Sequence, residues 1–201
     1  MAVEARKQFQ EYFTVHQNME IPDQWYLGIA ESAEMEFWGW EFEVGKSYEG
    51  PTPVYVPIAR EGKKQSLSFG GINALHVSTK DLSKLMRNID DQIQFVSASV
   101  GDKRMDYTIT NALVTIDAID YEKTKGQKYD DDQVRKNPKK NNIFKHIREL
   151  HLLRSPVNGH DFFRLNNSLG TLVVSAKFKA NAERLYKSNH GALFTPVSVS
   201  E

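Results

Sequence analysis

Two stretches of the chain share one order of apolar and polar positions. Residues 75–100 and 172–199 each begin with a short apolar run, continue with a serine, and then show apolar residues spaced by three and four before a polar turn and a second apolar run. The runs predict strands, and the spacing predicts a helix with one buried face. Because a serine hydroxyl can accept a hydrogen bond from a first-turn backbone N–H, we expect Ser78 and Ser175 to be helix N-caps.

The two stretches also share residues at matching positions. Aligned on the serine, they are identical at eight positions, with two additional residues in the turn of the second stretch. The identical pairs are Leu75–Leu172, Val77–Val174, Ser78–Ser175, Lys80–Lys177, Arg87–Arg184, Phe95–Phe194, Ser99–Ser198 and Val100–Val199. We therefore expect a strand–helix–strand unit that occurs twice.

Shorter apolar runs predict further strands. Alternation in residues 34–45 predicts a strand with aromatic rings on one face and Glu41 and Glu43 on the other. Residues 105–119 are rich in β-branched side chains and predict a long strand, whereas residues 143–153 predict a short helix that runs into a strand. Together these elements predict an α+β fold with mixed or antiparallel sheets.

We expect two lobes. Residues 1–71 predict a smaller, β-rich N-terminal lobe that carries acidic and aromatic side chains, and residues 72–201 predict an α+β C-terminal lobe that contains both repeated units. Within the second lobe, residues 122–142 contain only Tyr129 and Val134 as sizeable apolar side chains. We expect this segment to be a mobile, solvated loop because it can bury little apolar surface.

Composition restricts the environment of the protein, and the charge distribution restricts its partners. The 201 residues include no cysteine, which excludes disulfides and thiolate metal sites. No signal peptide or long apolar run is evident, so we expect a cytoplasmic protein without a membrane partner. The net charge is zero, but residues 20–49 carry a net charge of −7 and residues 123–190 a net charge of +9. Such a separation gives surfaces of opposite potential.

Patterns typical of catalysis or metal binding are weak. Asp117 and Asp120 form a candidate carboxylate pair at the end of a predicted strand, although aspartates at strand ends more commonly accept hydrogen bonds from loop amides. His146, His151 and His160 lie near one another, but spacings of five and nine match no standard zinc motif. We expect no catalytic residue, no metal and no cofactor.

A nucleic-acid-binding module that uses the basic segment 135–148 is the alternative interpretation. The cationic residues are Arg135, Lys136, Lys139, Lys140, Lys145 and Arg148. Such side chains can contact phosphates. However, Asp130–Asp132 precede the segment directly, and few aromatic residues are interleaved to stack on bases. We therefore favour a solvated segment and do not expect nucleic acid as the partner.

The acidic aromatic segment is the strongest candidate for a binding surface. All three tryptophans lie within sixteen residues, inside the region that carries eight acidic side chains. Aromatic rings commonly fill a core, but carboxylates concentrated in one lobe create a negative field that suits a basic protein surface. The candidate binding residues are Glu34, Glu36, Trp38, Trp40, Glu41 and Glu43.

A series of short motifs, taken in order, covers nearly the whole chain. They are WYLG at 25–28, FWGWEFEVG at 37–45, LHVSTKDLSKLM at 75–86, QIQFVSASV at 92–100, YTITNALVTIDAIDYEKT at 107–124, HDFFRLNNSLGTLVVSAKFK at 160–179 and GALFTPVSV at 191–199. This series resembles immunity-protein family eleven of bacterial polymorphic toxin systems, formerly classed as a domain of unknown function. The segment at 122–142 is longer than the usual connection of that family.

The resemblance implies a function but no catalytic residues. Members of such a family bind a cognate toxin domain and neutralise it. We therefore expect a non-enzymatic, cytoplasmic inhibitor that covers the active site of a toxin domain, which is a protein partner.

Overall fold

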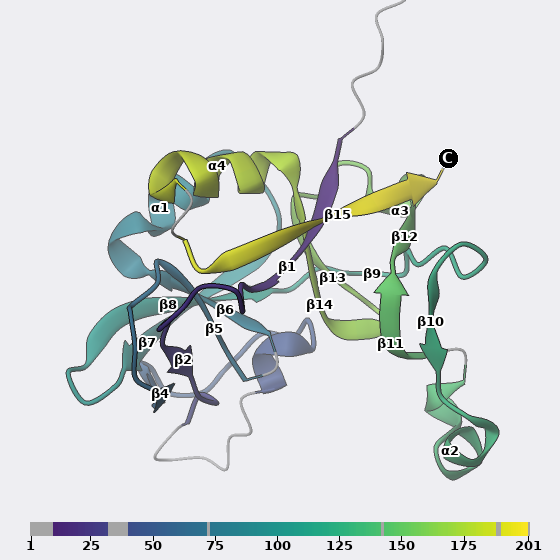
Figure 1. The fold of residues 1–201 in the computed structure, drawn as a ribbon, viewed down its shortest axis with the longest axis horizontal. Helices are drawn as coiled ribbons and strands as arrows, with labels where there is room; N and C mark the ends of the chain where they lie inside the picture. Colours follow the sequence, from purple (N-terminus) through teal and green to yellow (C-terminus); the bar gives the residue numbers. More distant parts are fainter. Residues whose placement is uncertain (1–9, 32–39, 72, 142, 188–189, 201) are drawn as a thin grey trace, which may run out of the picture.

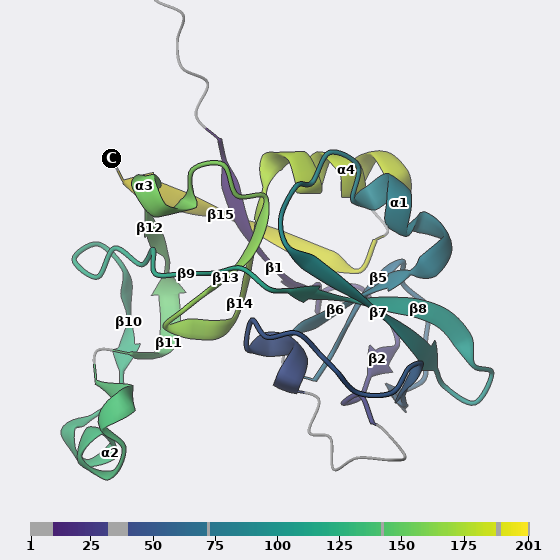
Figure 2. The ribbon, with the colours of Figure 1, turned by 180° about the vertical axis from the view of Figure 1, so that it is seen from behind.

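A computed structural model shows an α+β fold built on two larger sheets (Figures 1 and 2), which confirms the expected fold class. The structure describes residues 10–31, 40–71, 73–141, 143–187 and 190–200.

The larger sheets each combine strands from distant parts of the chain. The order in the five-stranded sheet is β3 (Val54–Val56), β7 (Ile93–Val100), β8 (Met105–Ala112), β6 (Ala74–Ser78) and β5 (Leu67–Gly70). The order in the six-stranded sheet is β12 (His151–Leu153), β15 (Ala192–Ser200), β1 (Tyr12–Gln17), β14 (Ser168–Ser175), β13 (Phe162–Leu165) and β9 (Thr115–Ile116). Two smaller sheets pair β2 (Tyr26–Leu27) with β4 (Ile58–Arg60) and β10 (Lys125–Lys128) with β11 (Phe144–Glu149).

Both predicted strand–helix–strand units are present, and each encloses a third strand. In the first unit, β6 and β7 run parallel to each other on either side of β8, which is antiparallel to both. In the second unit, β14 and β15 flank β1 in the same way. The connecting helices are α1 (Leu82–Leu85), which follows the 3-10 turn η2 (Thr79–Asp81), and α4 (Ala176–Tyr186).

The two units also share one strand register. Tyr107 of β8 pairs with Ser78 on one side and with Ala98 on the other. Tyr12 of β1 pairs with Ser175 and with Val197, the residues that the sequence alignment places opposite Ser78 and Ala98. The structure thus confirms the repeated unit. The difference lies in the source of the central strand, because β8 directly follows β7 whereas β1 comes from the start of the chain.

The two units bury one common core. Helices α1 and α4 contact each other and lie side by side above the strands (Figures 1 and 2). The core takes apolar side chains from both sheets and both helices, among them Phe13, Leu172, Val174, Leu67, Leu75, Val77, Leu85, Phe178 and Ala182. Of the two expected N-caps, Ser175 accepts a hydrogen bond from the N–H of Phe178 at 3.4 Å. Ser78 makes no cap bond, because η2 separates it from α1.

The segment before residue 71 contributes strands to both larger sheets. Strand β1 lies in the middle of the six-stranded sheet, and β3 and β5 form the two edges of the five-stranded sheet. The division into residues 1–71 and 72–201 stays a prediction about independently folding units. Any test of it has to account for the strand pairings across residue 71.

Two predicted elements differ from the structure. Residues 143–153 contain the strands β11 and β12 and no helix, so the predicted helix is wrong. The register shifts twice between β10 and β11, and a strand with such irregularities need not show a strict period of two in its apolar residues. The long strand predicted at 105–119 is divided into β8 and the short β9, which belong to different sheets.

The β10–β11 hairpin carries two short helical segments at its tip and extends away from the rest of the molecule (Figures 1 and 2). Helix α2 (Asp131–Lys136) begins with a capping box, in which the Asp130 carboxylate accepts from the N–H of Gln133 at 2.8 Å. The 3-10 turn η3 (Pro138–Lys140) follows. The segment 122–142 therefore has regular structure, and the mobility expected for it stays a prediction.

Candidate functional site

The structure describes only part of the predicted acidic binding surface. Glu34, Glu36 and Trp38 lie outside the described residues. Trp40 begins a 3-10 helix, η1 (Trp40–Glu43), where the sequence pattern predicted a strand, so the expected alternation of faces does not hold here. Glu41 is half-buried, whereas Glu43 is only 3% exposed. The Glu43 carboxylate therefore does not belong to a solvated face of the free protein.

Glu43 instead takes part in a buried polar cluster. Its Oε1 accepts a hydrogen bond from the backbone N–H of Asn73 at 2.9 Å. The Asn73 side chain donates to the carbonyl oxygens of Val15 at 3.1 Å and Gly170 at 3.0 Å, both in or beside strands of the six-stranded sheet. Through Asn73, η1 is thus joined to the six-stranded sheet.

Arg164 is the cation of this cluster and is fully buried. It donates to the carbonyl oxygens of Leu169 at 2.9 Å and Asn73 at 3.1 Å. Burial lowers the pKa of Arg164 to about 10, and the negative charge of Glu43 acts in the opposite direction. Glu43 therefore helps to keep a buried guanidinium charged. Sequence reasoning missed this residue, although an arginine inside the apolar run FFRL was a signal that an acid would be needed nearby.

Aromatic side chains anchor the acidic segment to the core. Phe42 is fully buried and packs against Tyr48 with ring centroids 5.1 Å apart. Trp25 is buried as well, and its indole N–H donates to the hydroxyl of Ser68 at 2.8 Å. The acidic residues of this region with accessible side chains in the described part of the chain are Glu20, Asp23, Glu31, Glu41 and Glu49. We call these five the accessible acids.

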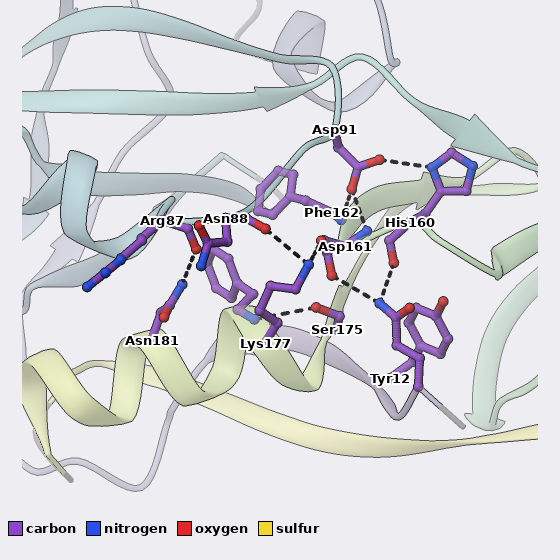
Figure 3. A network of polar contacts seen from close by, with 12 residues as sticks. Tyr12, Arg87, Asn88, Asp91, His160, Asp161, Phe162, Ser175, Lys177 and Asn181 are labelled. Atoms are coloured by element: carbon purple, nitrogen blue, oxygen red, sulfur yellow. Dashed lines mark hydrogen bonds and ion pairs between the residues drawn. The ribbon is translucent and has the colours of Figure 1, made fainter. Parts of the chain in front are cut away.

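A second polar network lies where the two repeated units meet (Figure 3). The Asp91 carboxylate accepts hydrogen bonds from the backbone N–H groups of Asp161 and Phe162, and contacts Nδ1 of His160 at 2.9 Å. The Lys177 ammonium group donates to the Asp161 carboxylate at 2.6 Å and to the carbonyl oxygen of Asn88 at 3.0 Å.

The same region fixes α1 to α4. The Asn181 side chain donates to the carbonyl oxygens of Leu85 and Arg87, at 2.9 Å each (Figure 3). Because the polar groups of this network bond one another and the backbone, the arrangement holds elements together and leaves no activated nucleophile. Its residues were not predicted, since they become neighbours only through the fold.

The two aspartates considered for catalysis bind nearby groups of the protein. Asp120 accepts from the N–H groups of Glu122 and Lys123, both at 3.1 Å, and from the Ser200 hydroxyl at 2.8 Å. The Ser200 hydrogen bond lowers the pKa of Asp120. Asp117 accepts from the Asn167 amide at 3.3 Å. These contacts favour the loop-capping interpretation over a catalytic pair.

The three histidines do not converge. His160 contacts Asp91, His151 contacts Glu149 at 3.0 Å, and His146 is exposed on β11. Across the described ranges no group of three or more histidine or acidic side chains is placed to hold a metal ion.

The basic segment lies along the β10–β11 hairpin, where several cations already have partners. Arg135 pairs with Asp132, and the ammonium group of Lys140 lies 4.6 Å from the ring centroid of Tyr129. The ammonium group of Lys128 lies 5.5 Å from the ring centroid of Phe144. These two rings are covered by lysines of the protein itself, which disfavours base stacking on them.

A groove of about 1090 Å³ lies between the six-stranded sheet and the hairpin. Its floor includes Thr14 and His16 of β1, Thr171 of β14, and Thr195 and Val197 of β15. Residues 146–150 form one wall, and the opposite wall includes Met19, Tyr26, Leu27 and Phe69. Of the described acidic candidates, neither Glu41 nor Glu43 lines this groove, whereas Arg148 of the basic segment does.

Comparison with known proteins identifies the chain through its family. In the part of the chain that the structure describes, no helix has the length and apolar character needed to cross a bilayer. No curated protein matches the sequence. The model of the Immunity protein family (Imm11) matches residues 5–199. Since this match spans nearly the whole chain, the protein belongs to the Immunity protein family (Imm11).

Proposed function

We propose that the protein binds a cognate toxin domain and neutralises it by covering its active site, without catalysing a reaction of its own. The family match over residues 5–199 is the observation that carries this proposal. The contacts made by Asp117 and Asp120 support it, because these two candidate catalytic groups are bonded to nearby groups of the protein. The compartment that we propose is the cytoplasm.

For the contact surface we propose the acidic aromatic segment, with Glu34, Glu36, Trp38, Trp40 and Glu41 facing the toxin. Carboxylates around an interface attract a basic partner and set the association rate, whereas aromatic anchors contribute most of the affinity. Glu43 has another part in this proposal. Its buried contact with Asn73 positions η1, and thereby the backbone that carries Glu41.

The mode of action is tested by titration against the cognate toxin domain. A covering inhibitor acts stoichiometrically, so residual toxin activity should fall linearly and reach zero at one equivalent. Complete neutralisation by a small fraction of an equivalent would show turnover and would contradict the proposal.

The surface is tested by charge reversal at accessible acids. Glu31→Lys, Glu41→Lys and Glu49→Lys together should slow toxin association by about tenfold at low salt, with a smaller effect at high salt. The control, matched in charge, carries Asp90→Lys, Asp102→Lys and Asp106→Lys, three exposed acids outside the acidic segment. Equal association rates for the two variants would show that the acidic segment is not part of the interface. The proposal that the protein neutralises a toxin domain would not be affected.

A further inference from the structure

The groove lies between β15 and the chain segment that contains β11 and β12, and this segment pairs with β15 only through β12. Strand β12 pairs with β15 at residues 151–153 and 198–200. Before residue 151 the chain runs along β11, which among the described strands pairs only with β10. Residues 146–150 line the groove, but no residue of β10 does. The groove therefore lies beside the edge of β11 that faces away from β10.

A free strand edge next to a groove can bind an extended peptide. The backbone N–H and C=O groups of such an edge can pair with an added strand, and the side chains of the groove then select the sequence. The floor suits a strand that lies across it, because Thr14 and Thr195 are directly paired neighbours with small side chains.

The charges of the groove favour an acidic occupant. Glu149 is the one acidic residue among those that line it, and its carboxylate is already bonded to Lys125 at 2.8 Å and to His151 at 3.0 Å. These contacts lower the pKa of Glu149. Arg148 also lines the groove and forms no hydrogen bond or ion pair with the described part of the chain. A carboxylate of an incoming segment would give this guanidinium a partner.

The opposite wall favours apolar side chains. Met19 lies there with 66% of its surface exposed, the largest exposed fraction among the large hydrophobic residues described. A methionine side chain is unbranched and adaptable, and an exposed one beside a groove is typical of an interaction site.

We propose that this groove binds an extended segment of the toxin chain in which acidic and apolar side chains alternate, with its backbone paired to β11 and a carboxylate on Arg148. The inference rests on the proposed function and adds a second contact, separate from the acidic aromatic segment.

A defined peptide tests the groove without the toxin. The probe is a fluorescein-labelled peptide of alternating Glu and Val, about eight residues long, so that it spans the four residues of β11 that line the groove. Its matched counterpart alternates Lys and Val. Fluorescence anisotropy with the full chain should show binding of the Glu peptide and none of the Lys peptide.

Two charge reversals on the same hairpin locate the binding. Arg148→Glu should weaken the affinity for the Glu peptide by about tenfold or more. Lys136→Glu makes the same change of charge at an exposed residue outside the groove and should leave the affinity unchanged. Equal affinities of the two variants, equal binding of the two peptides, or no binding by the unmodified protein would each overturn the inference.

The toxin itself separates this inference from the proposed function. Arg148→Glu, alone and with Thr195→Trp to fill the floor, should weaken binding of the cognate toxin domain by about tenfold. Unchanged affinity in the folded variants would refute the groove and leave the proposed function intact. Failure of the unmodified protein to bind that toxin would instead refute the proposed function, and the peptide result would then decide the groove alone.

Discussion

Tyr12 and Tyr107 occupy equivalent positions in two different sheets. Each lies on the central strand of a repeated unit, opposite the serine that ends the first strand of that unit. Both side chains are buried, and burial is the main reason why the pKa of Tyr12 is raised to about 12 and that of Tyr107 is raised as well. The two hydroxyl groups therefore stay protonated and can serve as buried hydrogen-bond donors.

Removing these hydroxyl groups should destabilise the protein. The Tyr12 hydroxyl donates to the carbonyl of Val157, and that of Tyr107 to the carbonyl of Gln65 at 3.1 Å. We expect Tyr12→Phe and Tyr107→Phe each to lower the free energy of unfolding by about 1 kcal/mol, because one buried hydrogen bond is lost. The carbonyl of Val157 keeps the N–H of His160 as a donor, and that of Gln65 keeps the hydroxyl of Ser68. Urea unfolding measures this. Tyr55→Phe, at a ring 38% exposed, is the control, and an equal loss there would contradict the argument.

The charge on Glu43 should be essential for stability. Glu43→Gln keeps an acceptor for the N–H of Asn73 but removes the negative charge that acts on buried Arg164. We expect a loss of about 3 kcal/mol in the free energy of unfolding, as for other buried charges deprived of a counter-charge. Glu41→Gln is the control and should change stability little. The double variant Glu43→Gln with Arg164→Met should have a higher free energy of unfolding than Glu43→Gln alone, because the buried charge is then removed as well. Equal values would show that the two residues are not coupled.

The carboxylate of Asp91 should matter far more than that of its neighbour. Asp91→Ala leaves the backbone N–H groups of Asp161 and Phe162 without their acceptor, and we expect a loss of about 2–3 kcal/mol. Asp90 is exposed, and Asp90→Ala should be nearly neutral. Thermal and urea unfolding of both variants give the comparison. Similar losses for both would show that the carboxylate does not connect the repeated units.

His76 should make stability depend on pH. Its Nδ1 lies 2.8 Å from the carbonyl of Ala74, which can only accept, so Nδ1 carries a hydrogen. Burial lowers the pKa of His76 from 6.5 to about 4. The unfolded chain therefore binds more protons than the folded chain between these values, so stability falls as the pH drops from about 6.5 to about 4.

The contribution of His76 is measured as a difference between two proteins. A change in pKa of this size corresponds to about 3 kcal/mol at the acid end of the range. His76→Gln should remove this part of the pH dependence, while the contributions of other groups cancel between the proteins. Parallel curves of unfolding free energy against pH for the two proteins would refute the assignment.

Strand β1 should be required for folding, and a separate peptide should be able to supply it. A fragment of residues 18–201 lacks the strand between β14 and β15, so we expect no cooperative unfolding transition. The fragment 72–201 should fail to fold for the same reason. A synthetic peptide of residues 10–17 added to the fragment 18–201 should restore the transition, and a peptide with Phe13 and Val15 replaced by Asp should not. Cooperative folding of the fragment 72–201 alone would support two independent lobes.

The repeated unit could be predicted because its signals are local. Apolar spacing and the serine before the helix lie within about 26 consecutive residues, and this is the scale on which such patterns are informative. The central strand of each unit could not be assigned in this way. Tyr12 and its partner Ser175 meet only in the tertiary structure, and nothing in residues 10–17 indicates which strands flank them.

For the acidic segment the sequence prediction was wrong. Alternation with a period of two predicted a strand, whereas residues 40–43 form the 3-10 helix η1. The pattern treated Glu43 as solvated because isolated carboxylates rarely lie in a core. The fold can bury it because Arg164 of β13 supplies a compensating positive charge. The groove was also missed, since it is formed by six separate segments of the chain whose residues carry no common motif.

The position of β1 determines when the fold can be completed. Ribosomes release the N-terminal end of a protein first, at about 5–20 residues per second. The strands that flank β1 are β14, which ends at Ser175, and β15, which ends at Ser200. Strand β1 therefore stays without its second neighbour until synthesis has passed residue 200, and a nascent chain cannot complete the six-stranded sheet before then.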